Sequence, residues 1–147
     1  MAAERTAKVS WSGNLLSGTG KIEFTGSGAL AGADMTWASR SEPDDGGRTS
    51  PEELIAAAHA SCFSMAFSAR LAKNGTPADQ LEVKVEVTFD QVEGGWKVAS
   101  SNIKVTGTVP GIDKATFERL ADDAKDNCPI SAAIRGNVEL SVEATLA

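Results

Sequence analysis

The chain of 147 residues lacks several features that would place it in large functional classes. No uninterrupted apolar run approaches the roughly 20 residues that a membrane-spanning helix needs, so we expect no membrane partner. The net charge is −6, from 14 basic and 20 acidic residues, and no cluster of lysine or arginine stands out. Because nucleic acids and anionic membrane surfaces attract basic patches, we expect neither as a partner.

Cysteine is also scarce, since Cys62 and Cys128 are the only two. The first residues do not show the charged-then-apolar order of a secretory signal, so we expect a cytoplasmic protein. Thiols stay reduced in that compartment, which favours reactive cysteines over a structural disulfide. The chain has no internal repeat, no low-complexity tract and no visible boundary, which predicts one domain over residues 1–147.

Alternating strands, glycine-rich turns and helical patterns are what the sequence does contain. Their order predicts the α+β class, with antiparallel sheets packed around a long central helix that carries Cys62. We expect strands at residues 7–11, 21–25, 33–39, 81–89, 96–99, 103–109 and 138–142, and helices at 51–73, 114–126 and 129–134.

The long helix has a well-marked start. Ser50 is a good N-cap, Pro51 suits the first helical position, and Glu53 completes a capping box. About 23 residues at 1.5 Å each give a length of roughly 35 Å. Small residues occupy most of its faces, so we expect the helix to be closely surrounded.

The two cysteines have different settings. Cys62 lies in the middle of the long helix, too deep for the terminal dipole to stabilise its thiolate, so it needs a cation from elsewhere. Pro129 makes Cys128 the expected N-cap of the next helix, which predicts that Cys128 is the more acidic thiol. The residues alone leave the order of attack open. Free cysteine is also among the most buried residue types, so core packing is the alternative role for each thiol.

His59 lies three residues before Cys62, on the same helical face. It could be the base of a Cys–His acyl hydrolase, or a zinc ligand together with both cysteines. No orienting group or oxyanion-loop signature supports the first role, and neither a CxxC nor an HxxxH pair supports the second. We therefore favour a hydrogen-bonded structural histidine.

Two segments together resemble a known family. Residues 51–65, with the sequence PEELIAAAHASCFSM, and the Cys-Pro-Ile-Ser stretch at 128–131 are similar to the OsmC/Ohr family, named for osmotically inducible protein C and organic hydroperoxide resistance protein. The segment at residues 51–66 and residues 109–113 resemble the OsmC branch more than the Ohr branch. The similarity extends from residue 11 to the last predicted strand.

The resemblance implies a thiol-dependent peroxidase that reduces organic hydroperoxides, and hydrogen peroxide less efficiently, in oxidative-stress defence. It implies an intertwined homodimer with two active sites at its interface. Carried over by position, Cys62 matches the peroxidatic cysteine, Cys128 the resolving cysteine, Glu52 the motif glutamate and Arg40 the catalytic arginine. No metal, haem or flavin is expected, and the implied reductant is an external dithiol, such as a dihydrolipoyl or thioredoxin-type protein.

The arginine is the least defined of these positions, since Arg5 or Arg48 could supply the charge in place of Arg40. Helix geometry adds one constraint. Glu52 and Cys62 are ten residues apart, or about 15 Å along a continuous helix. A carboxylate cannot span that distance, so we predict that any glutamate at the Cys62 site comes from the partner subunit.

A non-catalytic module is the main alternative function. It would hold a small apolar ligand in a dimer cleft, with both cysteines packed in the core. For a peroxidase, we expect a pocket lined by Phe63, Met65, Phe67 or Trp37 to favour organic peroxides.

Overall fold

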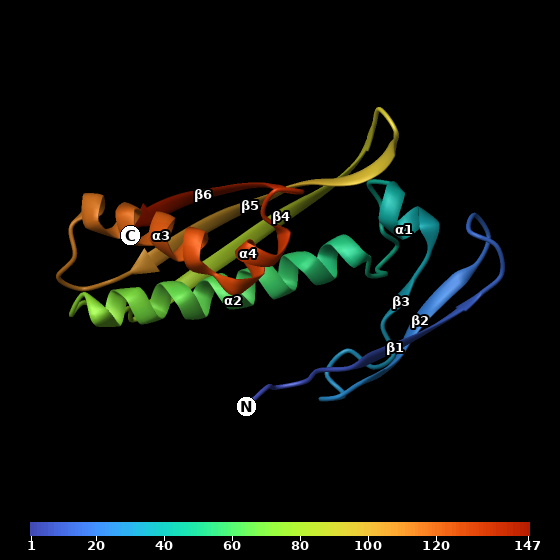
Figure 1. The fold of residues 1–147 in the computed structure, drawn as a ribbon, viewed down its shortest axis with the longest axis horizontal. Helices are drawn as coiled ribbons and strands as arrows, with labels where there is room; N and C mark the ends of the chain where they lie inside the picture. Colours follow the sequence, from blue (N-terminus) through green and yellow to red (C-terminus); the bar gives the residue numbers. More distant parts are fainter. The chain divides into compact units, whose positions relative to one another are not determined.

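The computed structural model describes every residue of the chain and divides it into two units, Met1–Leu54 and Ile55–Ala147 (Figure 1). The elements in chain order are β1 (Ala7–Ser12), β2 (Thr19–Thr25), β3 (Asp34–Met35), α1 (Trp37–Ser41), α2 (Pro51–Lys73), β4 (Gln80–Val92), β5 (Gly95–Thr108), α3 (Lys114–Asn127), α4 (Pro129–Ile134) and β6 (Glu139–Leu146). The predicted α+β class is confirmed.

The first unit is built on a three-stranded antiparallel sheet in the order β1-β2-β3. The indole of Trp11 packs on Gly20, where an added Cβ would lie 2.8 Å from the ring. Glycine at this position therefore lets the tryptophan lie flat across the neighbouring strand.

The strand expected at residues 33–39 is wrong for most of its length. Only Asp34–Met35 pairs with β2, and Trp37–Ser41 forms the helix α1. Thr36 and Ser39 make a reciprocal capping box, because the Ser39 N–H donates to Thr36 Oγ1 (3.0 Å) and the Thr36 N–H donates to Ser39 Oγ (2.9 Å). This cap starts a helix where the sequence showed weak alternation, and it places Arg40 on that helix.

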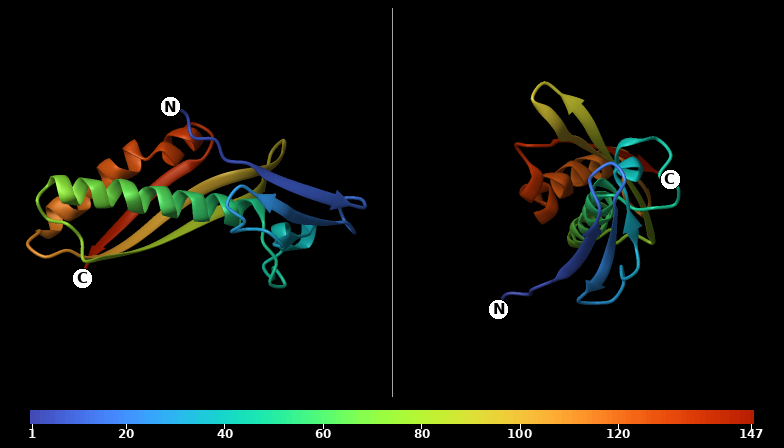
Figure 2. Two further views of the ribbon diagram at one scale, coloured as in Figure 1. Left: turned by 90° about the horizontal axis from the view of Figure 1, so that it is seen from below. Right: turned by 90° about the vertical axis from the view of Figure 1, so that its right-hand side faces the viewer.

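The second unit is a three-stranded sheet, β4-β5-β6, covered on one face by α2 and α3 (Figure 2). β4 and β5 pair antiparallel as expected, in a single long hairpin where the sequence suggested two separate strand segments after the turn. β6 pairs parallel to β5, so this sheet is mixed and not wholly antiparallel. The helices α3 and α4 provide the crossover that parallel neighbours require.

Alternation along the strands separates the two faces of this sheet. The helix-covered face carries Ile103 and Val105, which pack with Phe63, Phe67 and other apolar side chains of α2 and α3. The opposite face of all three strands is polar. Burial of one apolar face therefore fixes the register of the sheet.

The helix α2 runs along the strands for the predicted 23 residues. His59, Phe63, Phe67 and Leu71, spaced four residues apart, form its buried side. By length and composition alone α2 is also the one helix that could cross a membrane. One side of α2 packs on the sheet, and Cys62 lies next to that side, partly buried, three residues after His59.

Candidate active site

The central helix brings the two cysteines together. Cys62 projects from the middle of α2, and Cys128 lies between α3 and α4, where its extended backbone ends one helix and starts the next. Both are free thiols, and they lie close enough for each to change the pKa of the other. Cys128 is fully buried, whereas Cys62 is partly exposed in the chain by itself.

The same surroundings move the pKa values of the two thiols in opposite directions. Burial raises the pKa of Cys62, and the contact with Cys128 raises it further. Burial also acts to raise the pKa of Cys128, but the neighbouring Cys62 thiol, the Ser131 hydroxyl and the backbone N–H groups of Ser131 and Ile130 outweigh it and lower the pKa. Within this unit Cys128 is therefore the more acidic thiol, as its place at a helix start predicts. Its sulfur does not form a regular capping hydrogen bond, so the N–H groups act as nearby dipoles.

His59 is fully buried and has a serine at each ring nitrogen. Nδ1 lies 2.6 Å from Ser101 Oγ, and Nε2 lies 2.7 Å from Ser131 Oγ. Burial lowers the pKa of the imidazole, so it is neutral at pH 7. The predicted hydrogen-bonded histidine is confirmed.

This geometry weighs against both other roles of His59. Neither ring nitrogen is free to ligate a metal or to take a proton directly from Cys62. No group of three or more histidine, cysteine or acidic side chains in the chain could hold a metal ion. Ser101 and Ser131 were not expected as members of the site. Ser131 lies in the Cys-Pro-Ile-Ser stretch, but no signal in the sequence singles out Ser101.

Arg40 and Glu52 form the second pair, within the first unit. The guanidinium faces the carboxylate with Nη2 2.9 Å from Oε1 and Nε 3.2 Å from both carboxylate oxygens. The side chain of Glu52 is 7% exposed and that of Arg40 is 32% exposed. Glu52 lies in the first turn of α2, where the helix dipole favours a negative charge.

The other two arginines considered from the sequence have different partners. Arg5 donates to the carbonyl of Glu4, and Arg48 pairs with Asp34 at 3.1 Å. Glu53, which the capping box was expected to engage, donates its N–H to Ser50 Oγ at 3.1 Å. Arg40 is thus the arginine that the structure pairs with the motif glutamate.

Of the side chains predicted to line a substrate pocket, only Met65 is seen at a hollow. Phe63 and Phe67 are fully buried in the core, so they do not line an opening. Met65 is 70% exposed and borders a shallow hollow of about 600 Å³ between α2 and the start of β4, together with small side chains of α2.

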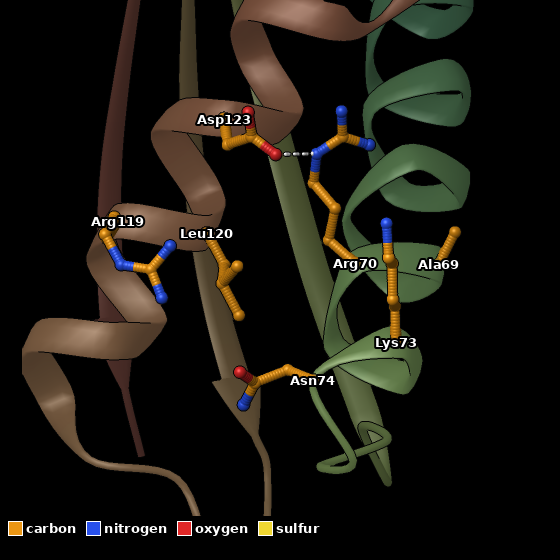
Figure 3. Close-up of a pocket in the computed structure, with 7 residues that line it drawn as sticks. All are labelled: Ala69, Arg70, Lys73, Asn74, Arg119, Leu120 and Asp123. Carbon is orange, nitrogen blue, oxygen red and sulfur yellow. Dashed lines mark hydrogen bonds and ion pairs between the residues drawn. The ribbon is translucent and has the colours of Figure 1, made fainter.

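A different hollow, of about 470 Å³, lies between the end of α2 and α3 (Figure 3). It is polar and lined in part by Arg70, Lys73, Arg119 and Asp123, and Arg70 pairs with Asp123 across it. Neither thiol lines this hollow. It is therefore not the apolar substrate pocket expected from the sequence.

Comparison with known proteins places this arrangement in a family. Residues 44–143 match the family described as OsmC-like protein. Peroxiredoxin OsmC of Escherichia coli strain K12 is 34% identical over 143 residues, which cover 97% of this chain and 98% of that protein. The chain belongs to the OsmC family.

Other OsmC-family relatives support the same assignment. An organic hydroperoxide resistance protein of Xanthomonas axonopodis pv. citri is 36% identical over 103 residues, covering 66% of this chain and 67% of the relative. The crystal structure of the organic hydroperoxide resistance protein OhrB of Bacillus subtilis is similar with a TM-score of 0.69 and 27% identity, and it covers 95% of this chain and 98% of OhrB. The family resemblance read from the residues is confirmed, and so is the expected α+β fold, except that β6 pairs parallel to β5.

Proposed function

We propose that this protein is a thiol-dependent peroxidase that reduces organic hydroperoxides, and hydrogen peroxide less efficiently, in oxidative-stress defence. The observation that carries the proposal is the proximity of a partly exposed thiol, Cys62, to a buried thiol, Cys128. Such a pair can take up an oxidising equivalent and store it as a disulfide. Relatives named peroxiredoxin OsmC and organic hydroperoxide resistance protein support the same activity.

The different exposure of the two thiols supports an order in which Cys62 is oxidised first and the disulfide forms second. An incoming peroxide meets Cys62 first, because Cys128 is fully buried. The Cys62 thiolate attacks the distal peroxide oxygen, the O–O bond breaks, and the alcohol leaves with a proton, so that Cys62 becomes a sulfenic acid. The Cys128 sulfur then attacks the Cys62 sulfur and expels the hydroxyl as water, which forms the disulfide.

Cys62 needs help to ionise, because burial and the neighbouring thiol raise its pKa. We assign that help to Arg40, held by Glu52 through charge-assisted hydrogen bonds. Glu52 and Cys62 lie on one helix, about 15 Å apart along its axis, so we assign the Arg40–Glu52 pair at each Cys62 to the partner subunit. The functional form in this proposal is a homodimer.

The exposed side of α2 supports a dimer. It carries Ala57, Ala69, Ala72 and the 70% exposed Met65, small or apolar side chains that let another chain approach the helix closely. A second copy of the chain packed on this side would surround the helix as its alanine content predicts. The substrate hollow would then be completed at the interface.

The remaining parts of the proposal are the reductant and the setting. An external dithiol, such as a dihydrolipoyl or thioredoxin-type protein, returns the disulfide to two thiols. The chemistry needs no metal or organic cofactor, because the electrons come from sulfur. We expect the protein to act in the cytoplasm.

Intact-mass measurement of the reduced protein after one equivalent of cumene hydroperoxide tests the activity. The wild type should lose two hydrogens, Cys128→Ser should hold a sulfenic acid, and Cys62→Ser should not react. A wild-type mass that does not change would overturn the peroxidase and favour the ligand-binding module. An oxidised Cys62→Ser protein would reverse the two cysteine roles.

Mixing two inactive variants tests the shared site. Arg40→Met and Cys62→Ser chains, unfolded together and refolded as a mixture, should recover about a quarter of wild-type activity. Half of the dimers formed would be mixed, and one of the two sites in each would hold both native residues. No recovery, with mixed dimers verified by mass, would show that Arg40 and Cys62 act within one chain.

A further inference from the structure

A line of hydrogen-bonded groups leads from the sheet to the resolving thiol. Ser101 on β5, His59 on α2 and Ser131 on α4 are each fully buried, and the imidazole bridges the two hydroxyls at 2.6 and 2.7 Å. Ser131 stands three residues after Cys128, at the start of α4, and its side chain is one of the groups that lower the pKa of the Cys128 thiol. The step from Cys128 to Ser131 is local to the start of α4, whereas His59 and Ser101 reach it from α2 and β5.

The hydrogen atoms along this line can be assigned. A neutral imidazole has one N–H donor and one acceptor nitrogen. If Ser131 donates its hydrogen to a Cys128 thiolate, its oxygen must accept from Nε2–H, and Nδ1 must accept from the Ser101 hydroxyl. Each group then donates once toward the sulfur, and every buried polar atom in the line has a partner.

The surroundings of His59 favour this neutral arrangement. Burial is the only cause that lowers the pKa of the imidazole, and no charged side chain contributes to that change. The groups that face its ring nitrogens from β5 and α4 are hydroxyls. His59 therefore acts through the direction of a hydrogen bond and not through charge.

We propose that His59 is a positioning residue for the second step of the reaction: it holds the Ser131 hydroxyl in the orientation that donates to the Cys128 sulfur. The inference rests on the proposed peroxidase function. Cys128 attacks the Cys62 sulfenic acid as a thiolate, the S–O bond breaks, and the hydroxyl leaves as water with the proton that Cys128 gave up. The Ser131 hydrogen bond stabilises the thiolate before attack, and Ser131 exchanges no atom with either sulfur.

Replacing His59 with glutamine or with asparagine distinguishes a hydrogen bond to Ser131 from simple filling of space in the core. The glutamine amide can place an N–H where Nε2 lies, whereas the shorter asparagine amide ends near the Nδ1 position and cannot reach Ser131. We would measure the conversion of sulfenic acid to disulfide in a single turnover, by acid quench and intact mass, for Ser131→Ala, His59→Gln and His59→Asn. Ser141→Ala, which removes a hydroxyl on the exposed face of the sheet, is the control.

Loss of one hydrogen bond to a charged sulfur should slow disulfide formation by about tenfold or more in Ser131→Ala and His59→Asn. His59→Gln should retain most of the rate, Ser141→Ala all of it, and sulfenic acid formation at Cys62 should keep its rate in every variant. Equal loss in His59→Gln and His59→Asn, or a disulfide rate in Ser131→Ala equal to wild type, would overturn the inference.

A second measurement does not depend on peroxide chemistry. In a Cys62→Ser background, the thiolate absorbance of Cys128 should titrate at a higher pH when Ser131 is replaced by alanine, and thermal unfolding verifies that the variant is folded. An unchanged titration would contradict the proposed hydrogen bond. If wild-type Cys62 forms no sulfenic acid at all, the proposed function fails, while this titration still decides whether Ser131 donates to Cys128.

Discussion

Replacing Arg40 with methionine should destabilise the protein more than replacing Glu52 with glutamine. Methionine keeps the unbranched stem of the side chain but removes every donor to the carboxylate. Glu52, with its side chain 7% exposed, would then hold a buried charge with no arginine opposite it. Glutamine at position 52 keeps an acceptor for Arg40, whose side chain is 32% exposed and can turn to water.

The burial of the Arg40–Glu52 pair sets how much each variant should lower the free energy of unfolding. Removing one partner of a buried ion pair costs about 3–5 kcal/mol. Partial access of water at Arg40 reduces this, so we expect Arg40→Met to lower the free energy of unfolding by about 3 kcal/mol. Glu52→Gln loses charge assistance and part of the helix-dipole interaction, at about 1 kcal/mol. The double variant should be more stable than Arg40→Met alone, because it no longer buries an unpaired charge.

Urea unfolding at one fixed protein concentration, followed by tryptophan fluorescence and circular dichroism, measures these values. Arg48→Met is the matched control, since its pair with Asp34 is exposed on both sides and should contribute about 0.5 kcal/mol or less. A double variant as unstable as the two single losses added together would refute the reasoning. So would an Arg40→Met protein that unfolds like the Arg48→Met control.

Two further predictions concern the second unit. Gly107→Ala should destabilise the core by about 1–3 kcal/mol in thermal unfolding, since its Cβ would lie 2.6 Å from the Phe117 ring, and Phe117→Leu should recover part of that loss. Asp113→Ala should lower the melting temperature at pH 7, because Asp113 caps α3 and the hydrogen bonds from Thr116 lower its pKa. A lowered pKa in the folded state stabilises above the ordinary carboxyl pKa, so the difference from wild type should shrink as the pH falls through the folded value. A difference that persists in acid would contradict this cause.

Elements with strong local signals could be predicted from the sequence. The bounds of α2 follow from the cap at Ser50, from Pro51 and from the Asn74-Gly75 end, and the structure shows the same 23 residues. The capping carboxylate of Asp113 likewise marks the start of α3. The parallel pairing of β6 could not be predicted, because strand direction is set by the crossover through α3 and α4 and by long-range packing.

In the site, too, residues with a local sequence signal could be predicted, and contacts between residues far apart in the chain could not. Cys62 and Cys128 could be picked out by their settings, and the pairing of Arg40 with Glu52 agrees with the positions carried over from the family. The helix α1 was not predicted, although its N-cap Thr36 and Ser39 carry a short capping signal. The contact of His59 with Ser101 joins residues 42 positions apart, and no spacing rule connects a helix histidine with a strand serine at that separation.

The unequal exposure of the two sulfurs also bears on how the disulfide would be reopened. A reducing thiolate needs a sulfur that it can reach, and Cys128 is fully enclosed whereas Cys62 is not. The mixed disulfide with a reductant would therefore form on Cys62 and release Cys128 as the leaving thiolate, a role for which a low pKa is well suited. Peroxide and reductant would then reach Cys62 through the same opening and react there one after the other. Ping-pong kinetics, with each substrate inhibiting at high concentration, is the expected behaviour of an enzyme with a single entrance.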